Sequence, residues 1–235
     1  MLTLFHHALS AGSRLIRLQL AEHQLDFDLK TQVPWQRDER FLAMNPAGSL
    51  PVLALDSDYR QTLCGVRAIS EWVEEQALGN AFAQQDRTPA SNLLGEQMLV
   101  RAETRRLIDW FEDKFQQEVS GPLIRERIIK RFSGNKPVNS DVIRAALVNA
   151  QTHVGYINFL AERSPWLAGD SLSLADFAAA AQISILDYFG DVDWERIPDA
   201  RLWYMKIKSR PCFRALLADQ IVGVTPSASY ANLDF

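Results

Sequence analysis

The stretch Leu50-Pro51-Val52-Leu53-Ala54-Leu55-Asp56-Ser57-Asp58-Tyr59-Arg60-Gln61-Thr62-Leu63 decides how the first part of the chain folds. The segments 50–55 and 61–63 flank the polar turn 56–58, which is the pattern of a β-hairpin. Helical spacing of apolar residues resumes directly afterwards with Ala68, Ile69, Trp72 and Val73. The stretch therefore predicts a hairpin followed by a helix.

The residues ahead of the hairpin predict a strand, a helix and a second strand. Residues 2–6 alternate as in a short strand, and residues 10–13 supply turn and capping residues for a helix over 15–21. Residues 26–30 alternate again, close enough behind the helix to run parallel to the first strand through a right-handed crossover. With an irregular stretch before the hairpin, the order β-α-β, loop, β-β-α predicts a thioredoxin-like module over residues 1–78.

The remainder of the chain predicts helices. Residues 79–92 are rich in turn formers and predict a linker, and apolar residues then recur at helical steps over 107–119 and 143–161. The strongest helix start is Leu172–Phe177, where Ser173 and Asp176 form a capping-box pair. The expected fold class is an α/β thioredoxin-like domain, then an all-α bundle over 93–218 and a non-helical tail over 219–235.

Composition excludes several classes of function. A net charge of −4 gives no global field to attract nucleic acid or an anionic membrane, and the basic cluster 124–136 has the spacing of a solvated helix face. No apolar run reaches the ~18 residues of a membrane span, and no secretion signal begins the sequence, so a cytoplasmic protein is expected. The four histidines lack metal-ligand spacing, and Cys64 and Cys212 lie far apart, so we expect neither a metal site nor a disulfide.

Short motifs in both parts resemble the soluble glutathione transferases. Asn45–Leu53 resembles their N-P-x-G-x-x-P-x-L signature, Arg67-Ala68-Ile69 the start of their third helix, and Ser173–Asp176 the capping box of their sixth. The resemblance implies the two-domain transferase fold over residues 1 to about 218. It also implies that Pro51 is the family's cis proline and that the backbone of Val52 would hold the cysteinyl part of glutathione.

The positions that would anchor glutathione depart from the family pattern. The family holds the γ-glutamyl end with an acidic residue and a serine directly before the Arg-Ala-Ile segment, where this chain has Gly65 and Val66. Two polar contacts of about 1.5–3 kcal/mol each are therefore absent, which lowers the expected affinity for glutathione. Ser10 lies near the family's catalytic position and would stabilise a glutathione thiolate there, or it is simply the N-cap of the following helix.

A narrower resemblance covers both domains and the tail. Residues 110–115, 166–181, 187–194, 203–211 and 230–235 are similar to the FtsZ-localised, glutathione-transferase-like proteins of alphaproteobacteria. That resemblance implies a homodimer at the division site that binds FtsZ filaments and links them to septal cell-wall synthesis. It implies no cofactor, and the net charge and apolar runs described above predict no nucleic acid and no membrane insertion.

Several residues are candidates for binding a protein partner. Trp35 stands in a polar loop and is either covered by the protein itself or available to a partner. Glu118 lies near the far end of the first bundle helix. In the tail, Tyr230, Leu233, Asp234 and Phe235 either pack on the helical domain or form a recognition handle for cell-wall synthesis proteins.

Two interpretations remain open. In the first, the chain is a non-catalytic adaptor that dimerises and binds FtsZ filaments, whose repeated subunits make weak contacts effective through avidity. In the second, it is a glutathione transferase that conjugates or reduces a small electrophile, with glutathione as cosubstrate and Ser10 stabilising the thiolate. Gly65, Val66 and the unusual tail favour the adaptor.

Overall fold

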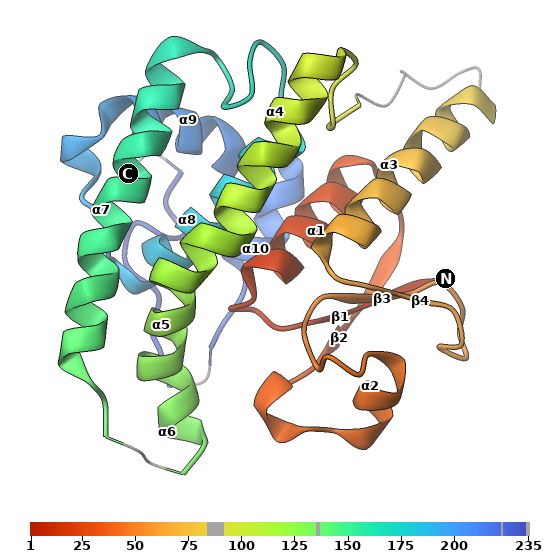
Figure 1. The fold of residues 1–235 in the computed structure, drawn as a ribbon, viewed down its shortest axis with the longest axis horizontal. Coiled ribbons are helices and arrows are strands. Elements are labelled where there is room, and N and C mark those ends of the chain that lie inside the picture. Colours follow the sequence, from red (N-terminus) through yellow and green to blue (C-terminus); the bar gives the residue numbers. More distant parts are fainter. Residues whose placement is uncertain (84–91, 135–136, 222, 234–235) are drawn as a thin grey trace. The chain divides into compact units, whose positions relative to one another are not determined.

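The fold is described from a computed structural model, which describes residues 1–83, 92–134, 137–221 and 223–233 (Figure 1). The chain divides into two compact units, Met1–Leu93 and Leu94–Phe235. No helix of the described residues is long and apolar enough to cross a membrane. Each unit is described by itself.

The first unit contains the predicted mixed sheet. Its elements are β1 (Leu2–His6), α1 (Ala11–Glu22), β2 (Phe27–Thr31), a 3₁₀ turn η1 (Pro34–Gln36), α2 (Glu39–Met44), β3 (Val52–Ala54), β4 (Thr62–Cys64) and α3 (Val66–Ala83). The strand order is β2-β1-β3-β4, with β1 parallel to β2 and antiparallel to β3, and β3 antiparallel to β4. The predicted β-α-β unit and hairpin are confirmed.

Alternation along the strands gives the sheet two apolar faces. Helices α1 and α3 cover one face, where Leu4 and Leu53 pack with residues such as Ile16 and Ile69 in a fully buried core. Helix α2 covers the other face, where Phe41 packs on a cluster that includes Phe5, Val52 and Ala54. Figure 1 shows α1 and α3 on one side of the strands and α2 on the other.

The second unit is helical. Its elements are α4 (Met98–Asp109), the π-helix η2 (Trp110–Ser120), α5 (Gly121–Ile124), the π-helix η3 (Arg125–Ile129), α6 (Lys130–Phe132), α7 (Ser140–Arg163), α8 (Leu174–Phe189), η4 (Trp194–Arg196), α9 (Pro198–Lys208), η5 (Pro211–Phe213) and α10 (Arg214–Leu217). Residues 98–132 form one uninterrupted helical path, which alternates between α and π geometry. π-Helix is rare in proteins and frequently occurs at functional sites.

Helix α8 is the buried centre of this unit, as its run of alanines predicts. Residues 174–188 are all buried, and Gly190 ends the helix in the left-handed conformation, at φ 74°. At its start, Asp176 Oδ2 accepts from the amide and hydroxyl of Ser173, at 2.9 and 2.8 Å. Asp176 Oδ1 accepts from the Leu167 amide at 2.8 Å and from the Trp203 indole at 2.9 Å. The predicted capping box therefore also ties α8 to α9.

Three details differ from the sequence-based expectations. The stretch before the hairpin is not wholly irregular, because Pro34 starts η1 and Asp38 caps α2 by accepting from the Arg40 amide. Helix α3 continues through residues 79–83, so the predicted linker began too early. Helix α9 begins at Pro198, since proline suits the first helical turn, and not at Trp203.

Candidate functional site

In the first unit, the structure brings together the positions that would hold glutathione. The Leu50–Pro51 peptide bond is cis, as the family resemblance implied. Val52 pairs with Phe5 on β1 and with Cys64 on β4. The Gly65 amide donates to the Pro51 carbonyl at 3.1 Å, so the start of β3 and the turn into α3 are neighbours.

Gly65 and Val66 form the turn from β4 into α3, and neither residue has a polar side chain. Gly65 has φ +85°, and among the described residues no atom lies within 4 Å of where a Cβ would stand. Val66 is the first residue of α3 and packs partly into the buried core of the sheet. What Val66 itself offers an anion at this helix start is therefore its backbone amide.

Ser10 is the N-cap of α1. Its Oγ accepts from the Ser13 amide at 3.2 Å, as a helix cap should, which leaves the hydroxyl proton able to donate to another group. The loop before Ser10 is held by Arg14, a fully buried side chain whose Nε donates to the Ala8 carbonyl at 2.6 Å. The capping role is thus confirmed, and a role toward a thiolate stays a prediction.

Trp35 lies beside the same loop. It is half-buried in η1, and its ring meets that of His7 edge-on with centroids 5.2 Å apart. His7 Nδ1 in turn accepts from the Leu9 amide at 3.2 Å. The first unit therefore covers part of the Trp35 ring itself and leaves the rest accessible.

Glu118 lies in η2 of the helical unit and is held by two side chains. The Lys114 ammonium contacts its Oε1, and His153 Nε2 is 2.9 Å from its Oε2. These hydrogen bonds lower the pKa of Glu118, so it is a carboxylate at neutral pH. Its side chain is 37% exposed, which makes it a charged group presented at the surface. Sequence reasoning missed His153, because it lies 35 positions from Glu118.

A second acid of η2, Glu112, has a different environment. Burial, reinforced by the neighbouring charge of Asp113, raises the pKa of Glu112 to about 8. Its Oε1 is buried without a hydrogen-bond partner among the described residues. Close by, Gln182 of α8 donates to the Phe111 carbonyl at 2.8 Å and accepts from the Ser120 hydroxyl at 2.6 Å. A polar side chain of the central helix thus satisfies groups in the π-helix.

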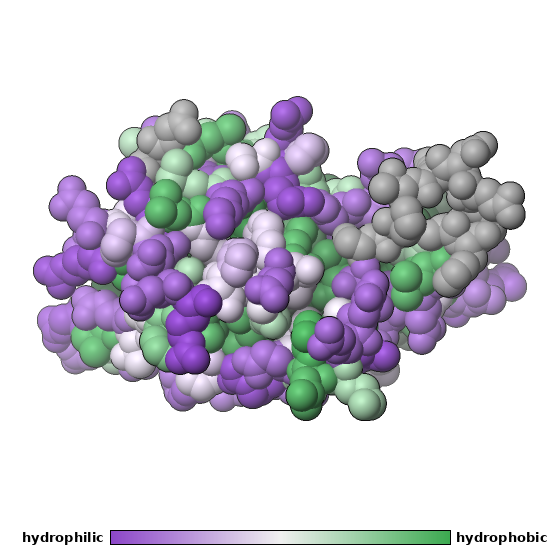
Figure 2. Space-filling view, turned by 90° about the horizontal axis from the view of Figure 1, so that it is seen from above, coloured by the Kyte–Doolittle hydropathy of each residue, from purple (hydrophilic) through white to green (hydrophobic). Residues whose placement is uncertain are grey.

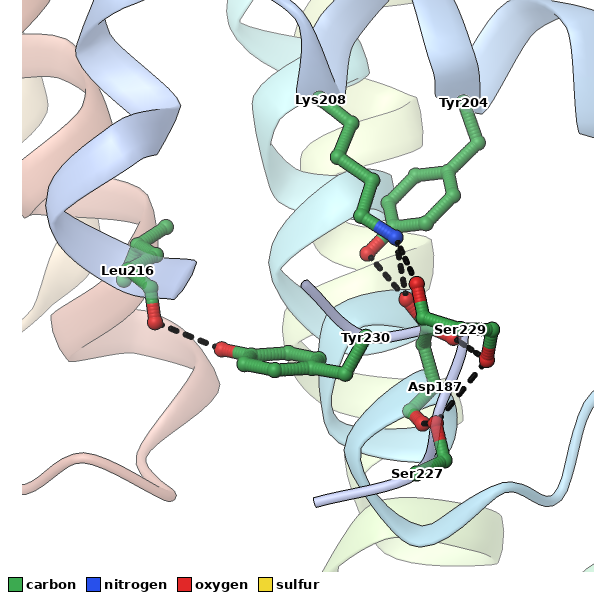
Figure 3. A network of polar contacts seen from close by, with 7 residues as sticks. All are labelled: Asp187, Tyr204, Lys208, Leu216, Ser227, Ser229 and Tyr230. Atoms are coloured by element: carbon green, nitrogen blue, oxygen red, sulfur yellow. Dashed lines mark hydrogen bonds and ion pairs between the residues drawn. The ribbon is translucent and has the colours of Figure 1, made fainter. Parts of the chain in front are cut away.

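The tail is fixed to the helical unit by a buried polar network (Figure 3). Lys208 Nζ lies 3.0 Å from Asp187 Oδ2, and both side chains are fully buried. The same ammonium donates to the Ser229 carbonyl at 2.6 Å, and the Ser229 hydroxyl donates to Asp187 Oδ1 at 2.7 Å. Burial lowers the pKa of Lys208, and the Asp187 charge opposes that shift. We call these residues, with Tyr230, the tail clamp.

Tyr230 is an anchor and not an exposed handle. Its side chain is fully buried, its hydroxyl donates to the Leu216 carbonyl at 2.7 Å, and its ring meets Tyr188 edge-on at 4.9 Å. The expectation that Tyr230 is presented to a partner is corrected, because the aromatic ring fills the core. Leu233 is 42% exposed beside a groove that Trp203 and Lys206 help to line. Asp234 and Phe235 lie outside the described residues.

The basic cluster 124–136 and the possible metal ligands do not form a further candidate site among the described residues. In the basic cluster, Arg127 pairs with Asp191, Lys130 with Glu126 at 2.7 Å, and Arg131 donates to the Gly223 carbonyl at 2.9 Å. Among the residues that the structure describes, no three His, Cys, Asp or Glu side chains form a metal-binding group.

Figure 2 shows one face, on which hydrophilic residues separate the hydrophobic areas. Polar contacts are therefore the better guide to a binding surface on that face.

Comparisons with known proteins agree with this geometry. The N-terminal domain family of glutathione S-transferases matches residues 4–81. FtsZ-localized protein A of Caulobacter vibrioides is 43% identical over 235 residues, which cover 99% of this chain and 98% of that protein. A glutathione S-transferase structure from Sinorhizobium meliloti 1021 is 44% identical with a TM-score of 0.90, and 100% of both chains is covered. The structure of FzlA from C. crescentus is 41% identical with a TM-score of 0.91, covering 100% of this chain and 99% of that one.

The match extends through both units. The mixed four-stranded sheet of the first unit and the helices of the second have the glutathione S-transferase fold. A relative that is 43% identical over nearly the whole of both chains includes the tail as well as the two units. The chain belongs to the glutathione S-transferase family and, within it, to the group of FtsZ-localized protein A.

Proposed function

We propose that the chain is a cell-division protein that associates with FtsZ filaments at the division site in the cytoplasm, as a homodimer and without a cofactor. The observation that carries this proposal is the 43% identity to FtsZ-localized protein A over nearly the whole of both chains. We further propose that it links the filaments to septal cell-wall synthesis. A dimer that meets a filament of repeated subunits gains avidity from two simultaneous contacts.

The first unit supports a function without glutathione chemistry. Gly65 and Val66 offer no side-chain hydrogen bond where the γ-glutamyl group would lie. Buried or half-buried polar ligand groups without partners lower affinity, so this place favours a scaffold over a glutathione site. In this proposal the surfaces of the fold bind protein partners, and the fold performs no glutathione chemistry.

The surface groups proposed to meet partners are chosen by exposure. Glu118 presents a fixed carboxylate on the helical unit, and Trp35 presents part of an aromatic ring on the first unit. Because the tail clamp fixes the chain at Ser229 and Tyr230, we assign contact with cell-wall synthesis proteins to Leu233, Asp234 and Phe235.

The test is co-sedimentation of the full chain with GTP-assembled FtsZ from the same cell, with and without millimolar glutathione. We expect the chain to pellet with the filaments equally in both conditions. A truncation after Tyr230 keeps the tail clamp and asks whether the last residues are needed for filament binding or only for a cell-wall synthesis partner. Failure of the full chain to pellet would contradict the proposed function.

A second candidate function is glutathione transfer, which the Asn45-Pro46-Ala47-Gly48 and Pro51-Val52 motifs and the N-cap hydroxyl of Ser10 favour. In this case glutathione is the cosubstrate and Ser10 holds its thiolate. It is tested by the thermal stabilisation that glutathione gives, and by loss of conjugating activity in Ser10→Ala. A shift of several degrees in the unmodified chain would favour the transferase. A shift found only in Gly65→Glu with Val66→Ser would show that the rest of the site is intact.

A further inference from the structure

A buried histidine of α7 connects two residues of η2. His153 is 1% exposed, and its ring lies 4.8 Å from that of Phe115. Trp110 Nε1 is 3.0 Å from His153 Nδ1, and His153 Nε2 is 2.9 Å from Glu118 Oε2. The three side chains thus form one path of hydrogen bonds from a half-buried indole to a carboxylate at the surface.

The indole N–H of Trp110 determines the tautomer of the His153 imidazole. An indole N–H can only donate, so His153 Nδ1 must accept from Trp110. The neutral ring then carries its proton on Nε2, which donates to Glu118. Burial lowers the pKa of His153, against the opposing effect of Glu118, so this neutral form is the one present at neutral pH.

The result is an exposed carboxylate with restricted rotation. Its Oε2 is held from the protein interior by His153, whereas its Oε1 is held by Lys114, whose own side chain is 47% exposed. An exposed ion pair has a small net value, so a cation from outside can replace Lys114 while His153 stays in place. A surface glutamate that is already fixed loses less rotamer entropy when it binds than a free one does.

We propose that His153 and Trp110 are positioning residues, which hold Glu118 as a pre-organised carboxylate for a basic side chain of the protein partner. The identity of that partner rests on the proposed function, in which it is an FtsZ filament. The positioning itself is a property of the free chain and can be measured without a partner.

The first test is ¹⁵N NMR of the imidazole of His153 in the full chain at neutral pH. We expect the Nε2–H tautomer in the unmodified protein. Trp110→Phe keeps an aromatic ring but removes the donor to Nδ1, so the Nδ1 resonance should move toward that of a nitrogen without a hydrogen bond, whereas Glu118 keeps the proton on Nε2. Unchanged ring nitrogen shifts in Trp110→Phe would overturn the proposed path.

The second test is affinity for GTP-assembled FtsZ, measured by co-sedimentation with a matched pair of variants. His153→Gln places an amide N–H near the position of Nε2 and keeps a donor to Glu118. His153→Asn places a carbonyl near the position of Nδ1 and keeps only the acceptor for Trp110. We expect about 10-fold weaker binding for Glu118→Gln and for His153→Asn, and less than about 3-fold for His153→Gln.

The outcomes separate the proposals. Equal losses in both His153 variants, or a loss in Glu118→Gln alone, would overturn the positioning role. If His153→Asn does not fold, Trp110→Phe takes its place in the binding assay. Asp141→Asn breaks another exposed ion pair, between Asp141 of α7 and Arg144, and serves as the control that should bind normally. If the unmodified chain does not pellet, the proposed function fails while the NMR result still decides the positioning.

Discussion

The helix start at Val66 and the tail clamp at Asp187 differ in how they treat polar groups. At the start of α3 the backbone makes a left-handed turn at Gly65, and neither Gly65 nor Val66 carries a polar side chain. Around Asp187 the structure buries two full charges and satisfies them with a serine hydroxyl and a backbone carbonyl. Two neighbouring positions of the fold are thus apolar at one place, whereas at the other each buried charge has a polar partner.

The largest expected effect comes from removing one charge of the tail clamp. Lys208→Met leaves the buried Asp187 without its cation, and we expect it to lower the free energy of unfolding by about 3–5 kcal/mol. Urea denaturation followed by circular dichroism measures the change. Lys206→Met removes an exposed lysine of the same helix, and we expect it to change stability by less than about 1 kcal/mol. Similar effects for the two lysines would contradict the importance of the clamp.

Glu112 differs from Asp187, because desolvation and the neighbouring charge of Asp113 raise its pKa. Its pKa is raised from 4.5 to about 8, so the folded chain binds more protons than the unfolded chain between those values. Stability should therefore be highest below pH 4.5 as far as this group is concerned, and fall by about 2–4 kcal/mol as the pH rises to 8. Thermal denaturation across this range measures it. Glu112→Gln should remove this part of the pH dependence, and an unchanged profile would refute the assignment.

At the helix start, the expected effects come from the backbone. Gly65→Ala introduces a Cβ at φ +85° and should lower the free energy of unfolding by about 1–2 kcal/mol, although the space is open among the described residues. Gly65→Asn should cost less, since asparagine tolerates the left-handed region. In contrast, Gly155→Ala lies within α7 without positive φ and should be neutral or stabilising. A larger loss at Gly155 than at Gly65 would contradict this reasoning.

The smallest expected effect concerns a single hydrogen bond of the clamp. Tyr230→Phe keeps the ring in the core but removes one of the donors to the Leu216 carbonyl, which still accepts from the Asp219 amide at 3.1 Å, so the loss should be about 1 kcal/mol. Tyr156→Phe removes a hydroxyl that accepts from the exposed Arg106 and is the matched control, with a smaller loss expected. Chemical denaturation of both variants gives the difference. Equal losses would show that burial of the Tyr230 hydroxyl adds nothing.

Sequence patterns predicted the features whose partners are close in the chain. The capping box joins Ser173 to Asp176 across three residues, and the hairpin joins neighbouring strands, so both are visible in the linear order. Helix α2 was missed because six residues, Glu39–Met44, are too few to display a helical period. The π-helix was missed because apolar residues at three- to four-residue steps fit α and π geometry alike.

The polar sites could not be predicted in the same way. His153 and Glu118 are 35 positions apart, and Lys208 and Asp187 are 21 apart, so no local spacing marks either pair. Tyr230 was a candidate for exposure because its segment has no helical period, yet it packs on Tyr188 from a different element. Family resemblance, by contrast, did locate Pro51, Val52, Gly65 and Val66 at one place.

The conformation of Gly65 makes mutation at this position asymmetric. A change from any residue with a Cβ to glycine relieves backbone strain at φ +85°, so it is favourable for folding even when it removes a ligand contact. The reverse change, from glycine to a residue with a Cβ, restores the ligand contact but also restores the backbone strain. When no ligand offsets the backbone strain, a substitution to glycine at this position is therefore favourable and its reversal is unfavourable.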